Sequence, residues 1–243
     1  MKKLLQFSFI LATYLSSGQT AFEKMFKPSG VSDIFLTYYD VIKSPDDSGY
    51  YTLSTFGGPD SGAILSLVGN DGILKWSKSY QRVTAIFKTF GLSVLPLSDS
   101  TLMLNLYDDG RTIQLKTSYS GTMLGAKKLN YISSTVYFQE EKNNAIYGVG
   151  RVSANGVNGG LFCKMDLDGN IIWSRMMNGG TSRRIELRAL TLTSDGGFLL
   201  AGTRQIYGTI LPASTILIKT DSIGNITWQR QLNYVNKILF LLP

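Results

Sequence analysis

The sequence predicts an all-β protein, and a repeated phrase is the first observation that supports this class. Two short apolar strands, joined by a tight turn and followed by a tryptophan four residues after the turn glycine, occur at Leu161–Arg175 and Ile216–Arg230. The same pattern occurs at Leu65–Lys78, and an imperfect copy at Leu115–Lys127 has Gly125 in the tryptophan position. The composition agrees, because 25 Gly, only 6 Pro and many β-branched and aromatic residues favour short strands and tight turns. No segment shows sustained helical periodicity.

The spacing of the four turn glycines predicts a β-propeller. Gly72, Gly121, Gly169 and Gly224 follow one another at intervals of 49, 48 and 55 residues. Four strands in about 40–50 residues is the size of one propeller blade. Segments such as Leu161–Cys163 are apolar without alternation, as expected of a strand covered on both faces by neighbouring blades. The sequence therefore predicts four recognisable four-stranded blades. A β-sandwich with coincidental periodicity is the alternative, although its strands should alternate more cleanly.

Alternation and turn residues divide each blade into four strands. The blades are expected at about 33–80, 90–129, 133–176 and 185–232. A Ser-Asp-Gly-Gly turn at Ser194–Gly197 is a strong hairpin signal in the last of them, because glycine adopts positive φ without steric cost.

Two lone strands are expected outside these blades, at 20–26 and 238–242. Propellers commonly close by pairing strands from both ends of the chain, so these two predict the N-terminal part of a larger propeller. Unpaired strand edges would then favour self-association. The alternative is that four blades close by themselves.

The first residues predict a signal peptide, residues 1–18. Met1–Lys3 is a positively charged start, Leu4–Leu15 is an apolar stretch of signal-peptide length, and Ser16–Gly18 offers small residues for cleavage. Twelve apolar-leaning residues are too few to span a bilayer, so no transmembrane anchor is expected. Cleavage would leave Gln19 first and direct the protein to the cell surface or the medium. For an exported protein, the net charge of +7 favours solubility or anionic surfaces over nucleic acid.

The repeats resemble those of bacterial secreted β-propellers. The resemblance rests on Met165–Trp173, on its sister Thr220–Trp228 and on the opening Ser194–Thr203, and it covers about Gln19–Leu232. Such repeats are typical of large exported proteins that often carry a type IX secretion sorting tail. The Gly-x-x-x-Trp phrase is also similar to the docking motif of PQQ-type (quinoprotein) propellers. In those relatives the tryptophan packs across the junction between blades. Gly125 and the missing sorting tail depart from the pattern.

Trp76, Trp173 and Trp228 are therefore interpreted, together with the four turn glycines, as structural blade-docking residues. Their fixed position after the turn favours packing between blades, where each ring buries a large apolar area. An aromatic sugar-binding set is the alternative.

Asp166, Asp168 and Asn170 form a calcium candidate, because their alternate oxygens have the spacing of a calcium loop. A calcium site needs six or more oxygens, which this turn does not supply. Asp and Asn also recur in turns because they bond their own backbone, and this explains the residues equally well.

No catalytic set or cofactor site is predicted. The chain contains no histidine, so the commonest general base and metal ligand is missing. Its single cysteine, Cys163, lies among apolar residues and is expected to be buried and inert. Arg183, Arg184 and Arg188 are expected to be solvated connectors, with anion binding as the alternative. The acidic pairs of the sequence, such as Asp108 and Asp109, are adjacent and do not face one another across a cleft.

The leading hypothesis is an exported, non-enzymatic propeller of a secreted or cell-surface protein. It would act as a binding or adhesion module, with a protein or glycan ligand at its loop faces, or as a spacer. The alternatives are a propeller enzyme of quinoprotein or polysaccharide-processing type and an envelope assembly scaffold.

Overall fold

The computed structural model describes residues 36–56, 62–81, 89–108, 110–129, 133–154, 156–178, 183–206 and 214–232. The predicted signal peptide and the predicted lone strands at 20–26 and 238–242 lie outside these residues. The described residues hold sixteen β-strands and no helix. The strands are β1 (Leu36–Lys43), β2 (Gly49–Phe56), β3 (Gly62–Gly69), β4 (Leu74–Gln81), β5 (Phe90–Pro96), β6 (Thr101–Asp108), β7 (Arg111–Ser118), β8 (Met123–Lys128), β9 (Ser133–Lys142), β10 (Ala145–Ala154), β11 (Val157–Met165), β12 (Ile171–Asn178), β13 (Arg183–Leu192), β14 (Phe198–Ile206), β15 (Ser214–Thr220) and β16 (Ile226–Leu232).

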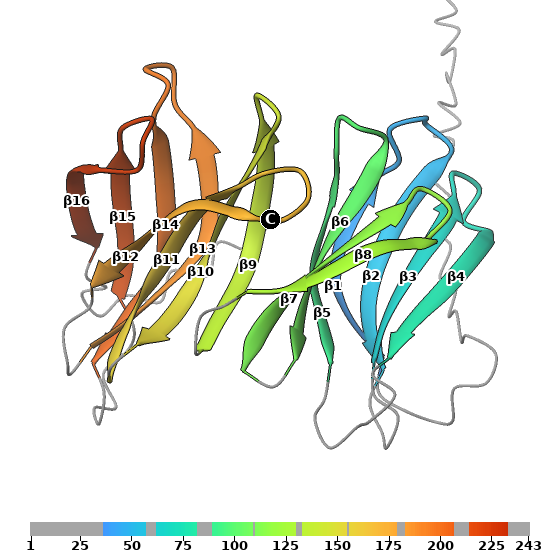
Figure 1. The fold of residues 1–243 in the computed structure, drawn as a ribbon, viewed down its shortest axis with the longest axis horizontal. Helices are drawn as coiled ribbons and strands as arrows, with labels where there is room; N and C mark the ends of the chain where they lie inside the picture. The colour runs from blue at the N-terminus through green and yellow to red at the C-terminus, as the bar shows by residue number, and fades with distance from the viewer. Residues whose placement is uncertain are drawn as a thin grey trace, which may run out of the picture.

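The strands form four antiparallel sheets, each built from four consecutive strands in chain order. We call these sheets blades one to four: β1–β4, β5–β8, β9–β12 and β13–β16. Figure 1 shows the first strand of each blade near the middle of the molecule, and β4 and β16 at opposite ends. The described blades thus form an open row, each packed on the next. This confirms the predicted all-β fold of four four-stranded blades and excludes the two-sheet sandwich.

The turn between the third and fourth strand is the same in all four blades. Gly72, Gly121, Gly169 and Gly224 have φ values of 73°, 76°, 78° and 85°, a region that residues with a Cβ rarely adopt. Each turn closes with two backbone bonds, such as Asp166 N to Asn170 O at 2.9 Å and Gly169 N to Asp166 O at 3.0 Å in blade three. The glycine is therefore required by the backbone, and this explains its recurrence at each repeat.

Every blade also has two irregularities in its ladder at equivalent places. One interrupts the pairing of the first and second strands, for example between Gly91 and Ser93 of β5. The other interrupts the pairing of the third and fourth strands just before the tryptophan position, for example between Lys164 and Met165 of β11. Bulges bend a strand and increase its local twist. Their repetition gives four blades of the same shape.

The hydrophobic core lies between blades rather than within them. One cluster joins blades one and two, a second joins blades two and three, and a third joins blades three and four. The largest buried side chains include Tyr51, Leu53, Phe162 and Met165. The third strand β11 is buried on both faces, as the unbroken apolar run predicts. In contrast, β16 is exposed along its whole length.

No helix in the described part of the chain is long and apolar enough to span a membrane.

Candidate functional site

The predicted docking residues meet at the junctions between blades. A Cβ added to Gly121 of blade two would stand 2.9 Å from Cζ3 of Trp76 in blade one. A Cβ added to Gly224 of blade four would likewise stand 2.9 Å from Cη2 of Trp173 in blade three. Each tryptophan is half-buried and packs against the core cluster of its junction. At these two junctions the turn glycine rests on the tryptophan of the preceding blade, whereas the Cβ position of Gly169 lies 3.1 Å from Cβ of Gln114.

The aromatic surroundings of Trp173 are the densest of the three. Its ring makes an edge contact with Phe162, with centroids 5.1 Å apart, and the guanidinium carbon of Arg175 lies 5.4 Å from its centroid. Trp228, on the outer strand of blade four, is 41% exposed and has Arg230 at 5.6 Å. The docking role of these residues stays a prediction, which substitution tests.

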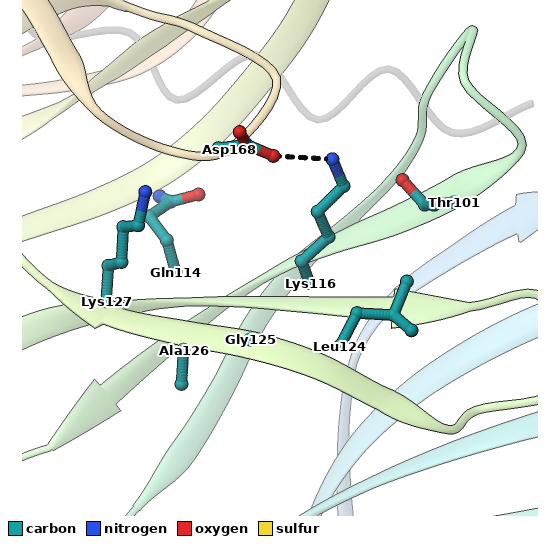
Figure 2. Close-up of a pocket in the computed structure, with 8 residues that line it drawn as sticks. All are labelled: Thr101, Gln114, Lys116, Leu124, Gly125, Ala126, Lys127 and Asp168. Carbon is teal, nitrogen blue, oxygen red and sulfur yellow. Dashed lines mark hydrogen bonds and ion pairs between the residues drawn. The ribbon is translucent and has the colours of Figure 1, made fainter.

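The junction between blades two and three differs, because blade two has Gly125 where the others have tryptophan. A Cβ added to Gly125 would meet no heavy atom within 4 Å. A cavity of about 360 Å³ lies there, which we call the Gly125 cavity (Figure 2). It is lined by Thr101, Gln114, Lys116, Leu124, Gly125, Ala126, Lys127 and Asp168.

A buried polar chain ends in this cavity. Asn105 donates from Nδ2 to Ser93 Oγ at 2.7 Å, and Gln114 donates from Nε2 to Asn105 Oδ1. The three residues lie side by side on β5, β6 and β7, and Asn105 and Gln114 are 0% and 1% exposed. Gln114 Oε1 has no hydrogen-bond partner among the described residues. Figure 2 shows this carboxamide between Lys127 and Lys116, beneath Asp168.

The other blades have apolar residues where blade two has Asn105 and Gln114. The residue seven positions before the turn glycine is Leu65, Gln114, Phe162 and Leu217 in blades one to four. The cross-strand partner of Gln114 is Asn105, whereas that of Leu65 is Leu53 and that of Phe162 is Val149. Two departures, the missing tryptophan and the buried amides, therefore fall on the same face of one blade.

Charged side chains line the outer end of the cavity. Lys116 Nζ lies 2.8 Å from Asp99 Oδ2 and 2.9 Å from Asp168 Oδ1, and the latter pair joins blade two to the turn of blade three. Lys127 Nζ donates to Asn170 Oδ1 of the same turn at 2.6 Å. Burial lowers the pKa of Lys116, but its bonds to the two carboxylates outweigh this, so its pKa lies above the ordinary value. Lys116 is therefore held as a cation.

The calcium candidate belongs to this turn. Asp166 Oδ1 accepts from the backbone N–H groups of Asp168 and Asn170 at 3.0 and 2.8 Å, and its Oδ2 accepts from Asn170 Nδ2. Asp168 Oδ1 accepts from the ammonium group of Lys116, and Asn170 Oδ1 accepts from that of Lys127. Turn formation and inter-blade bonding thus account for these residues. Among the described residues, no group of three or more acidic or cysteine side chains is placed to hold a metal ion.

A second feature lies at the first strands of blades three and four. Glu186 pairs with Arg151 at 3.3 Å, with Arg188 at 2.6 Å and with Arg184. The guanidinium carbon of Arg188 stands 3.7 Å from the ring centroid of Tyr137. A cavity of about 190 Å³ adjoins Tyr137 and Arg151. The expectation that Arg184 and Arg188 lie in a connector is wrong, because both lie in β13 and pair with Glu186, although the Arg188 side chain is 54% exposed.

The largest cavity described, about 580 Å³, lies between β4 of blade one and β7 and β8 of blade two. Its walls are mainly aliphatic. Tyr80 lines it and donates from its hydroxyl to Gly121 O at 2.8 Å, and burial raises the pKa of Tyr80 to about 12. The Gly125 cavity is smaller, but of the three cavities described it is the one that an unpartnered buried acceptor lines.

Cys163 is fully buried in the core between blades two and three. Burial raises the pKa of its thiol to about 12, so it stays protonated at neutral pH. It has none of the features of a nucleophile.

The sequence pattern identified Gly125 as a departure from the repeat, but it did not identify Gln114, Asn105, Lys116 or Glu186 as site residues. The signal that could have found Gln114 is a comparison of equivalent positions in the four repeats.

No protein-family model matches the sequence, and no curated protein matches it. Solved structures are similar to it. A protein of unknown function from Bacteroides caccae matches at a TM-score of 0.52 and 13% identity, over 85% of this chain and 69% of that chain. The periplasmic gluconolactonase PpgL of Pseudomonas aeruginosa matches at a TM-score of 0.52 and 11% identity, over 78% of this chain. This chain spans 56% of that enzyme. At such identities the likeness shows the fold alone, a β-propeller-like row of four-stranded antiparallel blades.

Proposed function

We propose that this chain is an exported, non-enzymatic β-propeller module that binds a ligand for a secreted or cell-surface bacterial protein. Three findings support the proposal. They are the fold, the signal-peptide pattern of residues 1–18, and the fact that one structural neighbour is a periplasmic protein. The resemblance of the repeats to propellers of type IX secretion supports the same location.

The Gly125 cavity is the observation that carries a binding role. Two of the three described junctions have a tryptophan and an apolar third strand, whereas the junction between blades two and three has Gly125 and buried amides in their place. Such an opening forgoes the burial of a large ring, which stabilises a fold by about 3–5 kcal/mol. A binding module has a use for the opening, whereas a spacer has none.

Export is tested by expressing the full chain in a Gram-negative host and measuring the mass of the product. Cleavage after Gly18 predicts a mature protein that begins at Gln19. Intact Met1 in the periplasmic or secreted protein would refute export by this signal.

Binding is tested by presenting the purified protein to arrays of bacterial and host glycans and to outer-membrane proteins. Saturable binding without product formation supports the module. Capture of outer-membrane assembly proteins would instead favour the scaffold alternative.

An enzyme that acts on sugar derivatives is the second candidate. It is favoured by the cavity of about 190 Å³ that Arg151, a partner of Glu186, lines, and by the activity for which the gluconolactonase neighbour is named. Proton release from glucono-δ-lactone, compared between the wild type and Glu186→Gln, tests it. Turnover that Glu186→Gln abolishes would replace the binding role with catalysis.

A further inference from the structure

We propose that the Gly125 cavity binds one saccharide ring, with a ring hydroxyl donating to Gln114 Oε1. This inference rests on the proposed binding function and names its ligand class and its site.

The shape of the cavity follows from the repeat. Gly125 pairs across the strands with Lys116, as Trp76 pairs with Leu67 and Trp173 with Lys164. The cavity therefore adjoins the place that a tryptophan ring fills in blades one and three, and Gln114 fills the part of that place beneath Gly169, with its Cβ 3.1 Å from the Cβ position of the glycine. Its volume of about 360 Å³ has room for one ring, and β8 lines it from Leu124 to Lys127.

The buried end of the cavity requires a donor from the ligand. Gln114 is 1% exposed, and its Nε2 is already bonded to Asn105, which is itself bonded to Ser93. This chain orients the amide so that Oε1 is the free atom, which has no partner among the described residues. Leaving a buried acceptor unsatisfied costs about 1–3 kcal/mol. A ligand O–H would satisfy it.

The outer end offers donors and acceptors together. Each ammonium carries three N–H groups. The bonds to Asp99 and Asp168 use two donors of Lys116, and the bond to Asn170 uses one of Lys127. The Asp168 carboxylate is an acceptor, and its side chain is 67% exposed. A ring that both donates and accepts at several positions can bond to all of these groups.

The charge balance favours a neutral ligand. The ammonium groups of Lys116 and Lys127 are offset by the carboxylates of Asp99 and Asp168 in direct contact with Lys116. An anion would meet Asp168, and a cation would meet both lysines. An indole ring would fill the space but carries a single donor, so it would leave most of the polar wall unused. A saccharide ring has hydroxyl groups for the wall and a C–H face for Leu124.

The test is a titration of the full chain with glucose, galactose, mannose and N-acetylglucosamine, followed by calorimetry and by saturation-transfer NMR. Indole and sulfate are the comparison probes. We expect one of the sugars to bind with a Kd in the millimolar range or below. Gly125→Trp fills the cavity with the ring of its sister blades and should abolish binding.

Gln114→Leu installs the side chain of blade one and should weaken binding about tenfold, the equivalent of one lost hydrogen bond to a buried group. Lys127→Ala should also weaken binding. Lys78→Ala is the matched control, because Lys78 holds the equivalent position in blade one and lies outside the cavity. It should bind like the wild type. Thermal melting establishes whether each variant folds. If Gly125→Trp does not fold, Lys127→Ala still tests the site.

The remaining outcomes overturn the inference. Saccharide binding that Gly125→Trp, Gln114→Leu and Lys127→Ala all leave unchanged would refute this site and leave the binding function standing. Binding of indole or sulfate but of no sugar would refute the ligand class. If the protein binds outer-membrane proteins but none of the small probes, the cavity is not a ligand site, and the proposed binding function still stands.

Discussion

The ring of Trp173 lies directly beneath Gly224 of the next blade, with 2.9 Å between Cη2 and the position that a Cβ on Gly224 would take. Trp76 and Gly121 repeat this relationship one junction earlier. Two residues from different repeats thus form one contact. The glycine is needed twice, because its turn has a positive φ and because a side chain would collide with the tryptophan of the preceding blade.

Gly224→Ala should lower the free energy of unfolding by about 2–5 kcal/mol. The positive φ of 85° costs about 1–2 kcal/mol for a residue with a Cβ, and overpacking against the ring adds about 1–3. Gly156→Ala is the matched control, because Gly156 has φ 76° but no heavy atom within 4 Å of its Cβ position. Urea denaturation measures both. Equal losses in the two variants would show that the ring contact has no effect.

Trp173→Ala should cost about 3 kcal/mol, because the ring packs against a buried aromatic cluster and its removal leaves a cavity. Trp228→Ala should cost about 1 kcal/mol or less, because that ring is 41% exposed on an outer strand. The two variants share chemistry and repeat position, so the difference between their unfolding midpoints isolates burial. A larger loss for Trp228 would contradict the arrangement.

Stability should fall below about pH 4, partly through Asp166. Burial raises the pKa of Asp166, but bonds from the side chain and backbone of Asn170 and from the backbone of Asp168 outweigh it, so its folded pKa lies below the ordinary value. A lowered folded pKa stabilises the fold above the unfolded pKa of about 3.9, and this is lost as pH falls through the folded value. Asp166→Asn removes the titration but keeps an acceptor oxygen. Its melting temperature should therefore decline less between pH 5 and pH 3 than that of the wild type. Parallel declines would exclude Asp166 as a contributor.

Glu186→Gln should destabilise the fold by about 1–3 kcal/mol. Its side chain is 12% exposed and pairs with Arg151, Arg184 and Arg188, which would lose their counter-charge. The loss should shrink in high salt, which screens the repulsion that remains among the arginines. Asp47→Asn is the control, because it removes an exposed ion pair with Lys43 whose side chains are 62% and 77% exposed. A loss in the control as large as that of Glu186→Gln would assign the effect to net charge.

Local sequence determined the strands, the turns and the number of blades. The turns depend on short segments of sequence. The hydrogen bonds of the Ser194–Gly197 hairpin and of the four glycine turns join residues only a few positions apart in the chain. The alternation and length of the apolar runs then place strands between the turns. The assignment of Arg183–Arg188 to a connector failed for a related reason. A charged run is typical of an exposed connector, but these residues lie in the first strand of blade four, where Arg184 and Arg188 pair with Glu186.

Only the tertiary structure decided where the candidate site lies. Gly125 alone indicated a degenerate repeat, and Gln114 alone indicated a polar residue in a strand. Cross-strand register put Gln114 beside Asn105, and packing of blade three on blade two brought Asp168 to Lys116 across 52 residues of sequence. The sequence could not locate the site because a cavity, or a buried acceptor without a partner, exists only through the residues that surround it. Surroundings assembled from four strands and two blades are absent from any single stretch of the chain.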